Sequence, residues 1–219
     1  MGPAIQEAIM WFMIHPIRNM PQGLFFVDQS KTASTTTGEV FWHAIMMSKG
    51  HIGGVHKTAR FLKFNYGRYW EPYHTFSTIR NPYDRFVSAY FFKSDDWHND
   101  EGMIEREISK EAILELMENV TAYPVRRQVH YVTDENGDVM VDQLILYPNL
   151  KRDIAKLAED FHVPLVNVDD YDECRLQTTR GKGDWRNFYD MYPDLWDIVT
   201  DIYQDDISLY LRLGGEIDR

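Results

Sequence analysis

The sequence predicts a three-layer α/β fold in which a mainly parallel central sheet is flanked by helices. Short apolar runs rich in β-type residues alternate along the chain with longer segments of helical periodicity, which is the pattern of such folds. At 219 residues and 44% hydrophobic content, the chain has the length of one domain and enough apolar side chains to fill its core. We therefore expect residues 1–219 to form a single domain.

The N-terminal half contains two strand-to-helix units. Residues 24–28 (LFFVD) are predicted as a buried strand, followed by a polar loop and a helix from about Thr35 to Ser48. Residues 73–80 (YHTFSTIR) are predicted as a second strand. Asn81 then suits a helix cap and Pro82 the first helical position. Apolar residues recur in this helix at helical spacing, which predicts a buried stripe: Tyr83, Phe86, Val87, Tyr90 and Phe91.

The C-terminal half continues the alternation of strands and helices. We expect a long surface excursion over 93–110, two β-like runs around an Asn-Gly turn within 129–147, and one long helix beginning near Pro193. The residues predicted to face the core from this last helix are Leu195, Ile198, Val199, Ile202 and Tyr203. The remaining elements are short: helices at about 110–119 and 148–161, and a strand at 163–168.

Charge and cysteine content exclude several classes of protein. The net charge of −11 predicts no overall attraction to nucleic acid or to an anionic membrane surface. Cys174 is the single cysteine, so no intramolecular disulfide forms, which favours a reducing compartment. The apolar run at 8–14 is too short to span a bilayer. We expect a cytoplasmic protein, with a lumenal domain of a longer chain as the alternative.

The loop after the first strand has the chemistry of an anion site. It reads Ser30-Lys31-Thr32-Ala33-Ser34-Thr35-Thr36 and leads into the predicted helix. Amide groups at a helix N-terminus are unpaired and favour negative charge, and Lys31 adds a cation. The loop lacks the glycines of a Walker A sequence. The alternative is an ordinary polar connection whose hydroxyl groups cap the helix.

A second group of polar residues lies in 78-TIRNPYDRFVSAYFF-92. Arg80 ends the predicted strand, and Ser88 is predicted on the flank of the following helix, facing neither the core nor bulk water. An arginine fork suits a phosphate dianion, which Ser88 could share. The alternative is a surface helix with a buried salt bridge at Arg80.

Together the two segments resemble the sulfotransferases, most closely the carbohydrate branch (heparan and chondroitin type) and its bacterial relatives. Their loop typically reads P-K-T-G-G-T-S, whereas this chain lacks the proline and has Ala33-Ser34 in place of Gly-Gly. The second motif, R-[DN]-P-x-x-R-x-x-S-x-Y, follows about fifty residues later, and the resemblance extends over most of residues 22–212. The residues that match the second motif are Arg80, Asn81, Pro82, Arg85, Ser88 and Tyr90.

The resemblance implies a P-loop-like domain that uses 3′-phosphoadenosine-5′-phosphosulfate (PAPS) as the donor and needs no metal. Loop 30–36 would hold the 5′-phosphosulfate, with Lys31 stabilising the leaving group, while Arg80 and Ser88 would hold the 3′-phosphate. The segment 180-RGKGDWRNF-188 is similar to the G-D-W-[KR]-N segment of cytosolic sulfotransferases. Arg180 and Lys182 would then lie over the 3′-phosphate, or they belong to a flexible basic loop.

Histidine is the usual group to take the proton of an acceptor hydroxyl. His56, in 55-VHKTARFL-62, is similar to the base of the carbohydrate branch, with His51 and His43 as alternatives. The acceptor is expected to be a small molecule or a glycan, and neither its identity nor the oligomeric state follows from the sequence. Two other functions stay open. One is a P-loop kinase-like phosphoryl transferase with Asp28 as the magnesium ligand, and the other is an inactive nucleotide-binding module.

Overall fold

The computed structural model of the chain describes residues 24–33, 37, 45–47, 56–94, 125–162 and 184–218. The predicted helix at 110–119 and strand at 163–168, and nearly all of the predicted surface excursion over 93–110, lie outside these residues. Within them, no helix combines the length and the apolar content that crossing a bilayer requires.

The described strands form one four-stranded sheet in the order β2-β1-β3-β4. All three neighbouring pairs are parallel, which confirms the α/β class predicted from the sequence. β1 and β3 occupy the centre and pair along their length, with Leu24 opposite His74 and Val27 opposite Ser77. The strands are β1 (Leu24–Val27), β2 (Ile45–Met47), β3 (His74–Ile79) and β4 (Gln143–Leu146).

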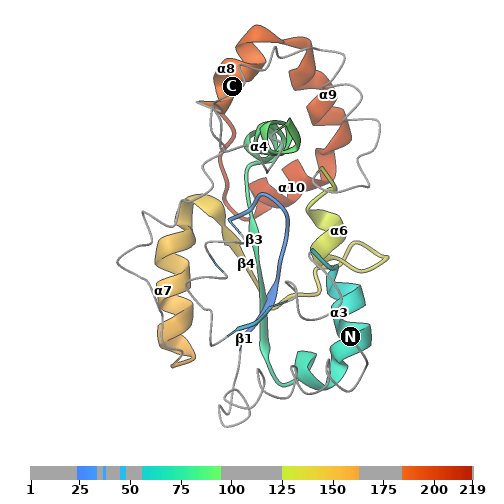
Figure 1. The fold of residues 1–219 in the computed structure, drawn as a ribbon, viewed down its shortest axis with the longest axis vertical. Coiled ribbons are helices and arrows are strands. Elements are labelled where there is room, and N and C mark those ends of the chain that lie inside the picture. Colours follow the sequence, from blue (N-terminus) through green and yellow to red (C-terminus); the bar gives the residue numbers. More distant parts are fainter. Residues whose placement is uncertain are drawn as a thin grey trace.

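Helices cover both faces of the sheet, as Figure 1 shows. Side chains alternate along β1: Phe25 and Val27 pack on the side of α3 and α6, and Leu24 and Phe26 pack on the side of α7. The helix α7 presents a stripe of buried residues at helical spacing to this second face. The helices on the first face are α3 (Ala59–Trp70) and α6 (Val129–Val132). The helix on the second face is α7 (Leu150–Asp160), which follows the 3₁₀ turn η2 (Tyr147–Asn149).

The remaining helices lie beyond the end of the sheet where β3 leads into α4 (Figure 1). As predicted, Asn81 caps α4: its side-chain oxygen accepts from the Tyr83 amide at 3.0 Å. Of the predicted stripe of α4, Tyr83, Phe86, Val87 and Tyr90 are buried against an aromatic cluster, whereas the side chain of Phe91 is not among those described. In this cluster Tyr83 stacks on Trp196 with ring centroids 4.0 Å apart. These helices are α4 (Pro82–Ser94), α8 (Trp185–Met191), α9 (Asp194–Ile202) and α10 (Gln204–Arg212).

The predicted helix from Thr35 to Ser48 is wrong at its C-terminal end, because residues 45–47 form the strand β2. Ile45, Met46 and Met47 pair with β1 in parallel register. A run of three apolar residues fits a helical stripe as well as a strand, and the neighbouring strand decides between them. Near the other end, the Thr37 amide donates to the Ala33 carbonyl at 2.9 Å, which is the hydrogen bond of a helical turn.

Two further predictions need correction. The first β-like run of 129–147 is the short helix α6, and only one antiparallel bridge, Thr133 to Val139, flanks the turn at Gly137. The predicted long C-terminal helix is two helices, α9 and α10, because the backbone leaves helical geometry at Tyr203 with φ −108° and ψ 22°. Leu195, Val199 and Tyr203 are nevertheless buried as predicted, whereas Ile198 and Ile202 are only partly buried against the same cluster.

Candidate functional site

The order of the strands singles out one edge of the sheet. The chain passes from β1 to β2 on one side and then crosses to β3 on the other side of β1, so the direction of winding reverses between β1 and β3. In open α/β sheets, ligands bind beyond the carboxyl ends of the strands at such a switch point. The two polar segments that the sequence singled out, 28–33 after β1 and Arg80 after β3, both begin at this place.

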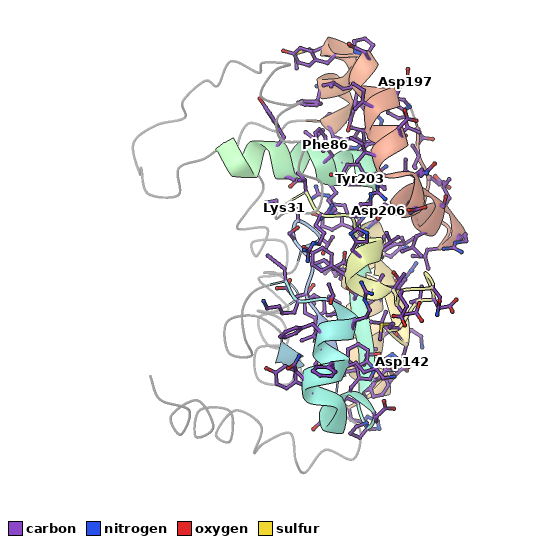
Figure 2. The ribbon with its side chains drawn as sticks, turned by 90° about the vertical axis from the view of Figure 1, so that its right-hand side faces the viewer. Lys31, Phe86, Asp142, Asp197, Tyr203 and Asp206 are labelled. Carbon is purple, nitrogen blue, oxygen red and sulfur yellow. The ribbon has the colours of Figure 1, made fainter. Side chains whose placement is uncertain are left out.

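The two segments are in direct contact. The Arg80 guanidinium donates from Nη1 to the Lys31 carbonyl at 3.1 Å, although the residues are separated by nearly fifty positions in the chain. Figure 2 shows Lys31 close to the level of α4, at the same end of the molecule as Tyr203 and Asp206 and away from Asp142. The lysine loop and the arginine segment therefore lie at one edge of the sheet, as the sequence motifs require.

The loop follows a path that glycine residues favour. Lys31 and Ala33 have φ of +62° and +65°, in the left-handed region that costs a residue with a side chain about 1–2 kcal/mol. Hydroxyl groups fix this path: Thr32 Oγ1 donates to the Gln29 carbonyl at 3.2 Å and accepts from Thr78 Oγ1 at 2.8 Å. The backbone thus keeps a glycine-like conformation at Ala33, where related loops carry glycine.

The buried side chain of Arg85, on α4, holds the start of the loop at Ser30. Arg85 is 1% exposed, and Nε donates to the Ser30 carbonyl at 3.0 Å. Nη2 donates both to Ser30 Oγ at 3.1 Å and to the Arg126 carbonyl at 2.7 Å. Arg85 matched the second motif but was not among the predicted site residues. The signal that could have marked it is its place one helical turn after Asn81, facing the same sheet edge as Arg80.

Arg80 is also held in an ion pair. Its Nε donates to Asp84 Oδ2 at 2.6 Å, and the guanidinium lies 4.5 Å from the centre of the Tyr147 ring. The salt bridge that the sequence left open as an alternative is therefore present. The bonds to Asp84 and to the Lys31 carbonyl use two of the five N–H groups of the guanidinium, so the pairing and an additional anion are compatible.

Two residues that the sequence motifs did not mark fix the backbone of Arg80. The Gln128 side chain accepts from the Arg80 amide and donates to its carbonyl, both at 2.9 Å. Asp206 of α10 in turn accepts from the Gln128 amide at 2.7 Å and the Val129 amide at 2.9 Å. Burial raises the pKa of Asp206, while Arg85 and the two amides act in the opposite direction.

Ser88 occupies a different environment from the one predicted. Its side chain is on α4 and the residue is only 2% exposed, whereas the helical wheel placed it on a flank between core and solvent. The reason is that α8, α9 and α10 all pack against α4, so the flank of the apolar stripe is covered as well.

His56 lies beside Asp28, the residue that directly follows β1. The distance from His56 Nδ1 to Asp28 Oδ2 is 3.1 Å, with side-chain exposures of 10% and 0%. His56 has a φ of +59° and precedes the start of α3 by three residues. Its backbone is therefore held in a conformation that few residues with side chains adopt.

Several predicted residues fall outside the described ranges: Ser34, Thr35, Thr36, Arg180, Lys182, His43 and His51. The structure therefore locates Ser30, Lys31, Thr32, Ala33, Arg80, Ser88 and His56 only. Of these, Ser30 to Ala33 and Arg80 are joined through the contacts described above.

Comparison with known proteins gives one match. A family model described as the sulfotransferase family matches residues 20–140, a range that contains β1, the lysine loop, His56 and the whole arginine motif. No curated protein and no solved structure matched the chain. Because the matched range covers more than half of the 219 residues, the chain belongs to the sulfotransferase family.

Proposed function

We propose that this protein transfers a sulfuryl group from PAPS to an acceptor hydroxyl, on a small molecule or on a glycan. Membership of the family supports sulfotransfer in general, and the resemblance to the carbohydrate branch favours a sugar hydroxyl. One observation carries the proposal. The Lys31 loop and Arg80 are joined by a 3.1 Å hydrogen bond at the switch point of the sheet, so one ligand with two anionic ends can reach both.

The charge of the donor suits this arrangement. PAPS carries roughly four negative charges, and charge grows on its departing phosphate as the bond to sulfur breaks. A protein with a net charge of −11 must concentrate its cations at one place to bind such an anion. Lys31, Arg80 and Arg85 lie together at this edge. The helix predicted after the loop would add its N-terminal end, and the hydrogen bond from the Thr37 amide to the Ala33 carbonyl supports this.

In the proposed roles, each residue acts on a different part of the reaction. Lys31 and the loop amides stabilise the departing 3′-phosphoadenosine-5′-phosphate (PAP), which is an interaction that strengthens in the transition state. Arg80 and Ser88 hold the 3′-phosphate, and His56 accepts the proton of the attacking hydroxyl. Cationic side chains and amides thus meet the charge of the reaction without a metal.

The test is thermal unfolding in the presence of PAP. At a concentration of about 100 times its dissociation constant, PAP should raise Tm by about 5 to 10 °C. The substitutions Lys31→Ala and Arg80→Lys should each abolish most of this shift. Lys156→Ala is the matched control, because Lys156 is an exposed cation paired with Asp160 in the C-terminal half of α7, and its shift should equal that of the wild type.

A wild-type protein whose Tm does not respond to PAP would refute the proposal. Stabilisation by ATP with magnesium, and not by PAP, would support a phosphoryl transferase in its place. With binding established, transfer of labelled sulfate from PAPS to panels of glycans, phenols and peptides would identify the acceptor. Binding without transfer to any of them would support an inactive nucleotide-binding module.

A further inference from the structure

We propose that Asp28 is a positioning residue for the reaction: its carboxylate holds the proton of His56 on Nδ1 and so presents the lone pair of Nε2 to the acceptor. This inference rests on the proposed function, in which His56 is the base. It concerns a residue that none of the sulfotransferase motifs contains. It also assigns a role to the carboxylate that the sequence had left open as a magnesium ligand.

The burial of Asp28 requires an explanation. Its side chain is completely buried, and its 3.1 Å contact with His56 Nδ1 is an ion-pair contact that does not have the geometry of a hydrogen bond. A buried carboxylate with no compensating group costs several kcal/mol. Among the described residues, the ion-pair partner of Asp28 is His56, at 3.1 Å. The carboxylate is therefore placed where the imidazole can neutralise it.

Both members of the pair are held by rigid elements. Asp28 directly follows Val27, the last residue of the central strand β1. His56 precedes Thr58, whose hydroxyl caps α3 by accepting from the Phe61 amide at 3.2 Å, and α3 packs against β1. The φ of +59° at His56 is unfavourable for a residue with a side chain, and such a conformation persists only where the surroundings impose it.

The chemistry follows from the two nitrogens of the ring. A neutral imidazole has one N–H and one lone pair, so a carboxylate beside Nδ1 favours the proton on that nitrogen. Nε2, on the opposite side of the ring, is then the acceptor, and the side chain is 10% exposed. A neutral histidine in this form can take a proton from a hydroxyl, and the carboxylate stabilises the imidazolium that results.

The transfer step balances with these groups alone. The acceptor oxygen forms a bond to sulfur while its proton moves to Nε2 of His56. The bond from sulfur to the bridging oxygen of the donor breaks, and its electron pair leaves with PAP beside Lys31. Because Asp28 is only three positions before Lys31, one short segment positions both the base and the cation at the leaving group.

The first experiment reads the tautomer directly by ¹⁵N NMR of the histidine rings at about pH 8, where a free imidazole is neutral. The His56 signals are assigned as those lost in His56→Ala. In the wild type we expect Nδ1 to carry the proton and Nε2 to be unprotonated. In Asp28→Asn, whose amide can donate to Nδ1, the proton should move to Nε2. A wild-type proton on Nε2, or protons on both nitrogens, would overturn the proposal.

The second experiment separates positioning from general structural damage. Asp28→Asn should lower kcat about 10²- to 10⁴-fold and leave the KM for PAPS and the PAP-induced rise in Tm unchanged. In a His56→Ala background the same substitution should change kcat by about twofold or less, because its effect acts through the histidine. If the two substitutions lower kcat independently, so that the double variant loses the product of the two single losses, Asp28 acts elsewhere and the proposal is overturned.

The chain offers a matched control and a second variant. Asp142 also lies beside a histidine, with Oδ2 4.0 Å from Nδ1 of His74, but at the opposite end of β3 from the site (Figure 2). Asp142→Asn should leave kcat unchanged. If Asp28→Asn does not fold, Asp28→Leu replaces the buried carboxylate beside a neutral imidazole with an apolar group, which removes the cost of burying a charge. The same tautomer change is expected because the carboxylate beside Nδ1 is gone.

The two proposals fail in different ways. If PAP does not bind and no acceptor is sulfated, the proposed function fails, while the NMR experiment still decides whether Asp28 sets the tautomer of His56. If PAP binds and sulfate is transferred, but the proton is on Nε2 in the wild type, only the role of Asp28 fails.

Discussion

Replacing Arg85 with lysine should destabilise the fold by about 2 to 6 kcal/mol. Arg85 is 1% exposed and donates to three acceptors: the Ser30 carbonyl, Ser30 Oγ and the Arg126 carbonyl. The ammonium of lysine is a single point and cannot occupy the positions of both Nε and Nη2. We expect two of the three buried acceptors to lose their donor, at about 1–3 kcal/mol each.

The measurement is urea denaturation followed by tryptophan fluorescence. The midpoint should fall while the m-value stays that of the wild type, since the surface exposed on unfolding does not change. Arg186→Lys is the control, because the Arg186 side chain is 42% exposed and its Nη1 lies 3.5 Å from Asp184 Oδ1, which is also exposed. Its effect should be below about 0.5 kcal/mol. Equal stability of Arg85→Lys and the wild type would refute the view that Arg85 clamps the loop.

Two further predictions concern the loop and its support. Ala33→Gly should stabilise the protein by about 0.5 to 1 kcal/mol, because relief of the left-handed strain at φ +65° exceeds the added freedom of the unfolded chain. Ala59→Gly in α3 should instead destabilise it, and thermal or urea unfolding that shows the same sign for both would contradict the reasoning. Burial raises the pKa of Asp206, so the folded protein binds this proton more tightly than the unfolded chain. The stability from this carboxyl is therefore present below the unfolded pKa of about 4 and lost as pH rises through the folded pKa. Because asparagine does not titrate, the gap in unfolding free energy between the wild type and Asp206→Asn should widen from about pH 7 to about pH 4, and a gap that narrows would contradict this.

Some parts of the fold that local sequence decides were predicted correctly, although the helix α3, which the adjacent Thr58 caps, was not predicted. The unit from β3 to α4 is the clearest case, because its cap and its first helical residue are adjacent in the chain. The Asn81 side chain reaches the Tyr83 amide within two positions. The stripe that begins at Tyr83 repeats at helical spacing, so its burial follows from geometry without knowledge of the partner.

The errors occur where a distant segment decides the local conformation. Val129–Val132 is rich in β-type residues, yet it forms the helix α6. The reason is that Asp206 accepts from the amides of Gln128 and Val129, and a carboxylate at these amides stabilises the start of a helix. The two residues lie 78 and 77 positions from Asp206, so no local pattern reveals this contact.

The site shows the same division. The residue types of the lysine loop and the arginine motif predicted an anion site, and the spacing of Arg80 and Asp84 could have predicted their ion pair, which is an i, i+4 pair. Asp28 was visible as a charged residue at the end of an apolar strand. Its contact with His56 depends on the way in which α3 packs against β1, and that arrangement is a property of the folded sheet.

The site is supported from beyond the region that the family model matches. Arg80 is held by Gln128, and the backbone at Gln128 is held by Asp206 of α10, which lies well outside residues 20–140. Tyr203 adds a second tie, since its hydroxyl donates to the Val125 carbonyl at 2.6 Å. Without the C-terminal helices, the amides of Gln128 and Val129 would lose their acceptor. Gln128 would then no longer be held in the position from which it bonds the Arg80 backbone. The described contacts that hold Arg80 therefore include residues outside the matched region.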